Sequence, residues 1–324
     1  MVKLASAEMA EKKLATRAAF GATLAELAEE GVPVVAVDAD LTGSTTTKKF
    51  AAAAPENAGK LFNCGIAEQN MIDVAAGLAL TGHVAYTGSF AVFGTGRAYD
   101  QIRNTVCYSN LDVKICPTHA GVSVGPDGGS HQMLEDISLM RGLPNMRVLV
   151  PADYAAARAA IKLAAKTPGP VYVRMGRAAV PCVYDDDVEL ELGRAYVLRE
   201  GSDATVVACG VEIREALAAA DALAEEGISI EVIDAFSVKP LDEDAITASV
   251  AKTGCCVVAE EHSVHGGLGS AVAECLARKN PAPCEFVGVQ DRFGKSGEFE
   301  ELLGYFNLDA AAIVEAVKRA MGRK

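Results

Sequence analysis

The most informative group in this 324-residue sequence is a carboxylate at the start of an apolar segment, where it could do chemistry. Residues 61–62 form a short apolar run that predicts a strand, and Gly65 ends it. Residues 66–80 have the composition of a buried helix, so Glu68 falls in its first turn. Ligands of open α/β sheets bind at this edge, outside the carboxyl ends of the strands. An acidic side chain in a first turn also complements the helix dipole, and the spacing alone favours that structural role.

Two loops that follow other predicted strands carry further polar and aromatic side chains. Asp40 and Ser44 lie in a turn-forming stretch after the strand at 34–37, and an ordinary turn explains them equally well. Phe90 and Phe93 come after the strand at 84–86. Two Phe residues three positions apart belong more often to a core than to a ligand platform, although the neighbouring residues are more polar than a core needs.

The strongest signal from composition alone is the glycine-rich loop of residues 119–132. It follows a predicted strand, has too many glycines to pack a core, and contains His119, Asp127 and His131. Long loops on rigid scaffolds are often functional. These side chains could bind a metal, and they could equally hydrogen-bond sugar hydroxyls and a phosphate.

Two further segments have the composition of anion sites. Arg174 and Arg177 follow the strand at 171–173, where an arginine beside a glycine suits bidentate phosphate binding, and surface ion pairs are the alternative. Residues 266–269 open a predicted helix with three glycines. They lack the spacing and the downstream acid of a dinucleotide site, and we interpret them as close packing of a helix against a strand.

An alternation of apolar strands and amphipathic helices positions these residues. It predicts two α/β domains, the first with a mostly parallel sheet covered by helices on both faces. We place domain one at residues 1–180, a linker at 181–193 whose acidic run 184–187 predicts a solvated loop, and domain two at 194–324. Domain one has predicted helices at 7–30, 66–80, 98–107, 133–140 and 155–165, and strands at 34–37, 61–62, 84–86, 113–116, 148–150 and 171–173. Domain two has predicted strands at 204–209, 228–233, 255–260 and 284–289, and helices at 212–226, 242–252, 268–279 and 308–321.

Composition and charge exclude several classes of protein. The net charge of −13 argues against a general nucleic-acid binder, because neutralising phosphates needs basic clusters. The nine cysteines form no CxxC pair and lie largely in apolar runs, so we expect reduced thiols and a cytoplasmic protein. The charged N-terminus has no signal core. The apolar region 71–93 is interrupted by glycines and polar residues, so we expect no membrane span.

Several of these motifs together carry a resemblance to a known family. In domain one they are residues 15–17, 38–42, Gly65-Ile66-Ala67-Glu68-Gln69-Asn70-Met71, 89–90, 97–103 and 119–128; in domain two they are 239–242, 260–262 and 266–269. In this order they resemble the C-terminal half of transketolase, and the resemblance covers nearly the whole chain. It implies a pyrimidine-binding domain followed by the smaller transketolase C-terminal domain.

The resemblance implies thiamine diphosphate as the cofactor, bound between domains of different chains, with the pyrimidine half bound here. The family residue at the position of Glu68 hydrogen-bonds the pyrimidine and promotes its imino tautomer, and family aromatics at Phe90 and Phe93 pack around the ring. Arg97 is expected near the cofactor, and His131 is expected to act in catalysis with Glu68. Gly96 looks like an additional residue relative to many family members, so the resemblance does not identify the residue on the third side of this pocket.

The resemblance also implies a sugar-phosphate site. Arg17, Ser44, His119 and Arg177 match family positions that bind the phosphate end. The positions that match contacts to donor and acceptor hydroxyls are Asp40, Asp127 and His131. No residue of this chain is expected to bind a metal.

The family's Gly-Asp-Gly motif, which holds Mg²⁺ and the diphosphate, does not occur in this sequence. Because Met1 directly precedes the first predicted helix, we expect a complete chain and a split transketolase of the pentose phosphate pathway. Its N-terminal half would then be a separate subunit that carries the diphosphate and Mg²⁺ site. We expect a heterotetramer with two copies of each subunit, acting on sugar phosphates.

Three alternatives remain open from the sequence. One is the β-subunit of a 2-oxo acid dehydrogenase, which shares the fold and the glutamate but acts on a more apolar substrate. Another is an enzyme similar to 1-deoxyxylulose 5-phosphate synthase, which normally keeps both halves in one chain. The third is a non-catalytic partner that has kept the fold, which would be expected to lose Glu68 and the loop at 119–131.

Overall fold

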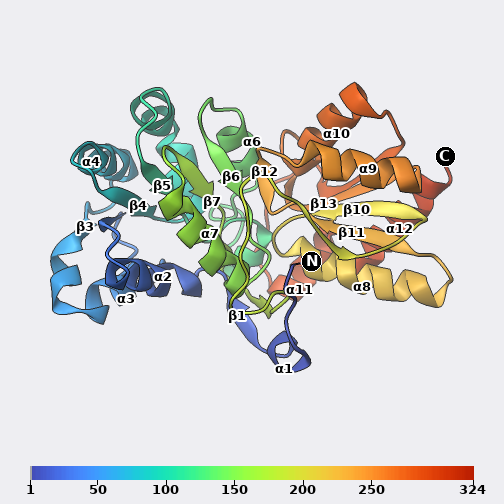
Figure 1. Ribbon diagram of the computed structural model, residues 1–324, viewed down its shortest axis with the longest axis horizontal. Coiled ribbons are helices and arrows are strands. Elements are labelled where there is room, and N and C mark those ends of the chain that lie inside the picture. The colour runs from blue at the N-terminus through green and yellow to red at the C-terminus, as the bar shows by residue number, and fades with distance from the viewer. Residues whose placement is uncertain (1) are drawn as a thin grey trace.

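Two α/β units follow one another in the computed structural model, which describes residues 2–324 (Figure 1). The first unit, domain one, contains the strands β1 (Lys13–Ala15), β2 (Val34–Asp38), β3 (Leu61–Asn63), β4 (Val84–Gly88), β5 (Val113–Ile115), β6 (Arg147–Leu149), β7 (Val171–Val173) and β8 (Ala179–Pro181). The second, domain two, contains β9 (Tyr196–Arg199), β10 (Ala204–Ala208), β11 (Ile230–Asp234), β12 (Ser237–Lys239), β13 (Cys256–Ser263) and β14 (Cys284–Val289).

Helices connect these strands in both units. The α-helices of domain one are α1 (Ala7–Ala10), α2 (Ala18–Glu29), α3 (Thr47–Ala53), α4 (Glu68–Leu80), α5 (Tyr99–Gln101), α6 (Asp136–Arg141) and α7 (Tyr154–Lys166). It also has the 3₁₀ helices η1 (Pro55–Lys60) and η4 (Val122–Asp127) and the π-helices η2 (Val92–Arg97) and η3 (Ile102–Cys107). Those of domain two are α8 (Glu212–Glu225), α9 (Glu243–Thr253), α10 (Leu268–Lys279), α11 (Phe299–Phe306) and α12 (Ala310–Met321).

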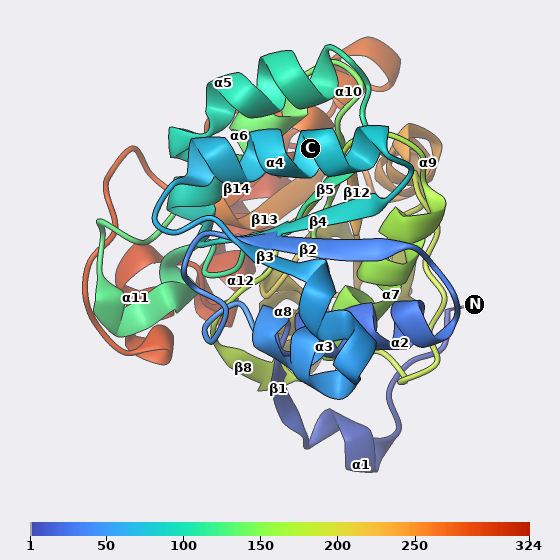
Figure 2. The same ribbon diagram turned by 90° about the vertical axis from the view of Figure 1, so that its left-hand side faces the viewer.

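Each unit is built on its own sheet. The seven-stranded sheet of domain one has the order β12-β6-β7-β5-β4-β2-β3, and only β12 is antiparallel to its neighbour. The five-stranded sheet of domain two has the order β14-β13-β10-β11-β9, with β9 antiparallel. Helices α4 and α5 cover one face of the first sheet, and α2 and α3 lie on the other (Figure 2). The predicted fold class, two α/β domains with mostly parallel sheets, is confirmed.

Strands buried on both faces explain why the apolar runs were readable in the sequence. Every residue of β2, β4 and β10 is buried, as expected for parallel strands between two helical layers. The two main hydrophobic clusters each contain residues of both domains, so apolar packing continues across the boundary between them. In residues 2–324, no helix combines the length and the apolar character needed to cross a bilayer.

The predicted single helix at residues 7–30 is wrong. The chain forms α1, then β1, then α2, because β1 pairs antiparallel with β8 instead of continuing a helix. Thr16 stabilises the break: its hydroxyl donates to the Gly176 carbonyl and accepts the Gly176 N–H at 2.7 Å. A tertiary pairing thus overrides the local helical pattern.

The connection between the domains agrees with its prediction only in part. Asp186 and Asp187 of the acidic run are exposed, as expected for a solvated loop. Tyr184, at the start of the run, is fully buried, and its hydroxyl donates to Asp234 at 2.6 Å. Strand β12 belongs to domain two in sequence, yet it pairs with β6 at the edge of the domain-one sheet. A buried hydrogen bond therefore fixes the linker to domain two, and the two domains share a sheet edge. The sequence pattern predicted neither β12 nor α11.

Candidate functional site

Glu68 is the first residue of α4, just beyond the carboxyl end of β3. Gly65 provides the turn with a φ of +68°, and its N–H donates to the Asn63 side chain at 3.0 Å. Although the Glu68 side chain is only 1% exposed, its Oε2 accepts a hydrogen bond from Arg97 at 2.9 Å. The guanidinium of Arg97 is half exposed, so this ion pair joins a buried carboxylate to the surface.

Aromatic rings gather beside this ion pair. Phe90 and Phe93 stack with centroids 6.3 Å apart, and Arg97 lies over the Phe93 ring at 4.8 Å. His131 meets both rings edge-on, at 5.4 Å from Phe93 and 6.1 Å from Phe90. His119 stacks on Phe90 at 3.9 Å. The structure therefore brings these predicted rings together, and Arg97 links them to Glu68.

A π-helix sets the direction of two of these side chains. Phe93 and Arg97 both lie in η2, and so does Gly96, the residue that looked additional in the sequence. A π-helical turn accommodates one more residue than an α-helical turn, and such turns are frequent at functional sites. Gly96 is therefore accommodated within a widened helical turn.

Two arginines define a second part of the site. Arg17 donates to the Ser44 carbonyl at 2.8 Å, and Arg177 donates to the Val124 carbonyl at 2.7 Å. Both line a cavity of about 310 Å³, which the glycine-rich loop and the start of α11 complete. Burial lowers the pKa of Arg17, and the charge of Arg177 lowers it further, whereas Asp127 opposes this effect. Two guanidinium groups that repel one another at a cavity suit an anionic ligand.

His119 connects the aromatic and the basic parts. It is 3% exposed, has a φ of +62°, and shares a hydrogen bond with the Thr118 hydroxyl at 2.7 Å. Burial lowers the pKa of His119 to about 3, and the charges of Arg17 and Arg177 add to this effect. The ring is thus neutral at physiological pH and can both donate and accept a hydrogen bond.

Asp40 lies apart from these groups. Its carboxylate accepts from the side-chain amide of Asn63 at 3.3 Å, and its N–H donates to the side-chain oxygen Oδ1 of Asn63 at 3.0 Å. Among residues 2–324 the structure assigns Asp40 no hydrogen bond to the arginines, the histidines or Glu68. It reaches the site only through Asn63, which also binds the Gly65 N–H.

Arg174 does not belong to the anion site with which the sequence grouped it. It is 6% exposed, and it donates to Asp136 at 2.7 Å and to the Glu261 carbonyl at 2.9 Å. The hydroxyl of Tyr172 donates to the same Asp136 carboxylate. Such a fully paired buried charge is a structural element between the domains, so the phosphate-binding interpretation of Arg174 is wrong.

The glycines at 266–269 pack closely, as expected. The amides of Leu268 and Gly269 donate to the Glu260 carboxylate at 2.7 and 2.8 Å, and a Cβ at Gly267 would collide with that carboxylate. The helix terminus that resembled an anion cradle therefore already holds an anion of this chain. The interpretation as helix–strand packing is confirmed.

The sequence missed the residues of domain two that approach the site. Glu261 accepts the N–H of Ser123 in the glycine-rich loop, and Glu298 and Phe299 line the cavity at Arg17. Burial raises the pKa of Glu261 to about 7, while the charge of Arg174 opposes that rise. The Glu-Glu-His motif was visible in the sequence, but nothing local indicated that its second carboxylate faces the other domain.

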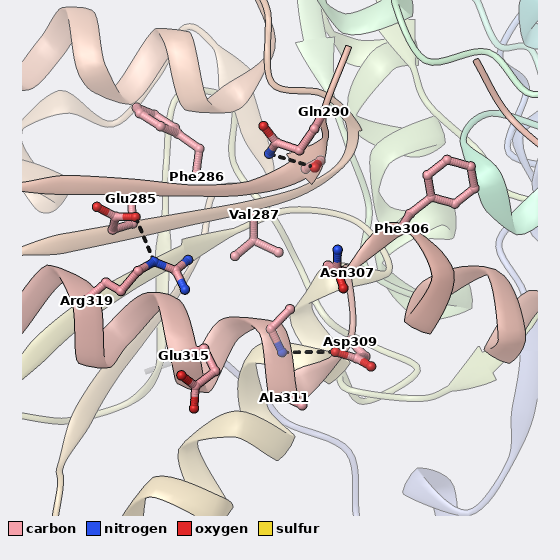
Figure 3. A pocket seen from close by; sticks show the side chains of 12 residues that line it. Glu285, Phe286, Val287, Gln290, Phe306, Asn307, Asp309, Ala311, Glu315 and Arg319 are labelled. Carbon is pink, nitrogen blue, oxygen red and sulfur yellow. Dashed lines mark hydrogen bonds and ion pairs between the residues drawn. The ribbon is translucent and has the colours of Figure 1, made fainter. Parts of the chain in front are cut away.

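Another cavity, of about 620 Å³, lies in domain two between β14 and α12 (Figure 3). Two of its charged groups are engaged within the protein: Arg319 binds Glu285 at 3.2 Å, and Asp309 caps α12 through the Ala312 N–H. None of the predicted site residues lines this cavity. In the part of the chain that the structure describes, no cluster of three or more His, Cys, Asp or Glu side chains is placed to hold a metal ion.

Comparison with known proteins agrees with this geometry. The family model for the pyrimidine-binding domain of transketolase matches residues 12–183, and the model for the transketolase C-terminal domain matches residues 193–313. Together the matches and the site define a chain of the thiamine diphosphate enzymes, because a pyrimidine-binding domain implies dependence on that cofactor. Within that class, the chain belongs to the transketolase family.

Three relatives illustrate the similarity. The chain is 44% identical to a putative transketolase C-terminal section of Methanocaldococcus jannaschii, over 95% of this chain and 96% of that protein. It is 37% identical to human transketolase, over 94% of this chain and 49% of that protein. A split-gene transketolase solved as an inactive β4 tetramer superimposes with a TM-score of 0.87 at 48% identity, covering 96% of this chain and 99% of that one.

The residues around Glu68 suit the pyrimidine ring of that cofactor. The aromatic faces of Phe90 and Phe93 offer stacking, and Glu68, which pairs with the Arg97 that lies over Phe93, offers a hydrogen-bond acceptor. Beside Phe90, the Ser89 hydroxyl is buried and has no hydrogen-bond partner in residues 2–324. An orphaned buried hydroxyl next to an aromatic pair is consistent with a site that is completed by a polar ligand.

Proposed function

We propose that this chain is the C-terminal subunit of a split transketolase, which transfers a two-carbon ketol unit between ketose and aldose phosphates. One observation carries the proposal: the loop of residues 119–131 connects the aromatic cluster beside Glu68 with the cavity at Arg17 and Arg177. His131 packs against Phe93 beside Glu68, and His119 lies within the charge field of Arg17 and Arg177. A carboxylate with aromatic walls and an anion site are thus linked through residues 119–131.

In the proposed mechanism, Glu68 binds the edge of the cofactor pyrimidine, and Phe90 and Phe93 pack against the ring. When bound, thiamine diphosphate supplies the nucleophilic carbon that adds to the ketose carbonyl. His131 is placed to exchange a hydrogen bond or a proton with a substrate hydroxyl through its imidazole. Arg97 keeps Glu68 oriented until the cofactor binds, because the two side chains share the 2.9 Å ion pair.

Arg17 and Arg177 would hold the substrate phosphate, with the neutral His119 as a further donor. Each arginine donates one hydrogen bond from Nη1 to a backbone carbonyl. This bond orients the guanidinium and leaves its other N–H groups for a ligand. Ser44 supports Arg17 through its carbonyl. Asp127 and Asp40, both exposed, are proposed to reach substrate hydroxyls.

The same basic pair discriminates against the 2-oxo acid dehydrogenase alternative, whose substrate has a more apolar chain. Relatives act on diverse sugars: one, 42% identical, is a subunit of a 6-deoxy-6-sulfo-D-fructose transketolase, and another, 39% identical, is a subunit of an apulose-4-phosphate transketolase. These names support an anionic sugar as the substrate class. We propose a sugar phosphate of the pentose phosphate pathway as the natural substrate.

The proposed partner is a separate N-terminal subunit that binds Mg²⁺ and the diphosphate, in an assembly of two copies of each chain in the cytoplasm. The relative solved as an inactive β4 tetramer supports this proposal, because chains of that kind associate without being active. Neither nucleic acid nor a membrane is proposed as a partner.

The experiment is an assay of ketol transfer with the purified chain alone, with its partner subunit alone, and with both. We expect activity only from the mixture, with thiamine diphosphate and Mg²⁺ present. Transketolase activity from this chain by itself would contradict the split-subunit proposal. Sedimentation of the active mixture measures whether the subunits combine two plus two.

A further inference from the structure

Domain two holds the glycine-rich loop along most of its length. The N–H of Ser123 donates to Glu261 Oε1, and the Gln132 amide donates to the Lys295 carbonyl at 2.9 Å. The same amide also donates to the Val122 and Gly125 carbonyls within the loop. The loop that carries three of the proposed substrate residues is therefore fastened at both ends to the other domain.

The glycines of this loop are required by that contact. Gly121 and Gly128 have φ values of +80° and +79°, in the region that disfavours other residues. A Cβ at Gly121 would collide with the Glu261 carboxylate, and one at Gly128 would collide with the Ser296 hydroxyl. The loop is rich in glycine where the backbone approaches domain two.

Glu260 and Glu261 are neighbours on β13 with different tasks. Glu260 binds the Leu268 and Gly269 amides inside domain two, whereas Glu261 points to domain one. Glu261 is 3% exposed, and Arg174 lies 3.8 Å from its Oε2 while donating to its carbonyl. A buried carboxylate with an arginine behind it and a loop amide in front has one preferred orientation.

We propose that Glu261 is a positioning residue of the substrate site. By accepting the Ser123 N–H it holds residues 119–131 in place, and with them His119, Asp127 and His131. Glu261 thereby affects binding of the sugar phosphate through the loop, without lining the cavity at Arg17 and Arg177 itself. The assignment of these residues to a substrate rests on the proposed function, but the fastening of the loop does not.

The first experiment is hydrogen exchange on the chain alone, comparing Glu261→Ala, Glu261→Gln and the control Glu260→Gln. Loss of a hydrogen bond to a charged group is expected to speed exchange of peptides covering 119–132 by about tenfold in Glu261→Ala. Glu261→Gln retains a carbonyl oxygen and should restore much of the protection. Glu260→Gln should affect peptides of α10 and leave the loop unchanged.

The second experiment measures kcat and KM for the sugar phosphate in the complex with the partner subunit. We expect Glu261→Ala to raise KM by about tenfold with a smaller change in kcat, and Glu261→Gln to recover most of it. If Glu261→Ala fails to fold, Gly121→Ala provides the same test. Its Cβ would push the loop away from Glu261, so it should raise KM in the same way.

The outcomes separate the two proposals. Faster loop exchange in a chain that never shows ketol transfer would refute the proposed function and keep the positioning role. Unchanged exchange at 119–132 in Glu261→Ala would overturn the positioning role, whatever the activity. A KM change of equal size in Glu260→Gln would also overturn it, because the effect would then be a general one of domain-two stability.

Discussion

Glu68 in domain one and Glu212 in domain two are each the first residue of a helix that follows a parallel strand. Both side chains are buried, at 1% and 0% exposure. Glu68 pairs with Arg97, which is half exposed. Neither carboxylate oxygen of Glu212 has a hydrogen-bond partner within residues 2–324, and burial, with the charges of Glu261 and Glu215 adding, raises its pKa well above the ordinary 4.5.

The comparison teaches that a position at the carboxyl edge of a sheet does not by itself make a site. Both edges carry buried acids, but at the edge of domain two Glu260 binds backbone amides and Glu212 is held in its neutral form. At the edge of domain one, the Glu68 carboxylate is joined to a half-exposed cation and an aromatic stack. The two carboxyl groups therefore differ in their connection to solvent and in their hydrogen-bond partners.

The largest expected effect is on kcat, and it tests the difference between Glu68 and Glu212 directly. Glu68→Gln removes the acid proposed to act on the cofactor, and should lower kcat of the two-subunit enzyme by about 10²- to 10⁴-fold. Glu212→Gln, the matched variant in domain two, replaces a neutral carboxyl with a group of the same shape and should leave kcat unchanged. Assays with saturating cofactor and circular dichroism of both variants provide the measurement. Equal losses in the two variants would contradict the distinction.

Much of the fold was predictable because its strands are buried on both faces. The runs at 34–37 and 171–173 needed only apolar residues in sequence to be recognised, and they are strands in the structure. Strands whose partners lie far along the chain were not predictable. Strand β1 reads as part of a helix until β8 pairs with it, and β12 has three residues whose partner strand lies in the other domain.

The site was predictable to the extent that motifs lie in order after strands. Glu68, Phe90 and His131 were indicated in this way. In the structure Phe90 and His131 lie in one aromatic cluster, and Arg97 joins that cluster to Glu68. Glu212 and Glu261 were not indicated as notable groups, because an acid in a first helical turn or at a strand end has the same local pattern in both domains. Only the fold shows that Glu212 is buried without a hydrogen-bond partner, whereas Glu261 is buried and accepts the Ser123 N–H of the loop.

Two glycine substitutions sharpen the comparison between the sheet edges. Gly267→Ala places a Cβ against Glu260 at a φ of −81°, so its cost is one of packing, about 1–3 kcal/mol of domain-two stability. Gly128→Ala meets Ser296 at a positive φ and should instead raise KM for the sugar phosphate by moving Asp127 and His131. Urea denaturation and steady-state kinetics of both variants test this. A KM effect of Gly267→Ala equal to that of Gly128→Ala would remove the distinction.

The pH dependence of stability provides a smaller and more specific test. Unfolded Glu212 ionises near its ordinary pKa of 4.5, whereas the folded form, with its raised pKa, stays protonated. Its contribution to stability is therefore complete below about pH 4.5 and is lost as the pH rises. Glu212→Gln lacks this titration, so the variant should gain stability relative to the natural chain from pH 5 to pH 8, measured by thermal unfolding. A constant difference over this range would contradict a sealed, neutral Glu212.

The smallest effect concerns His119, the buried neutral group of the domain-one edge. Its pKa of about 3 arises from burial and from the charges of Arg17 and Arg177, so His119 is neutral partly because cations lie near it. Nuclear magnetic resonance of the imidazole nitrogens should show no titration between pH 5 and 8. Arg177→Ala should raise the midpoint toward 6.5, as should inorganic phosphate, whereas Arg199→Ala in domain two should leave it unchanged. A midpoint near 6.5 in the natural chain would mean that neither burial nor the arginine charges lower the pKa of His119. An unchanged midpoint in Arg177→Ala would mean that the charge of Arg177 does not reach His119, and the anion site would then lose its link to the aromatic one.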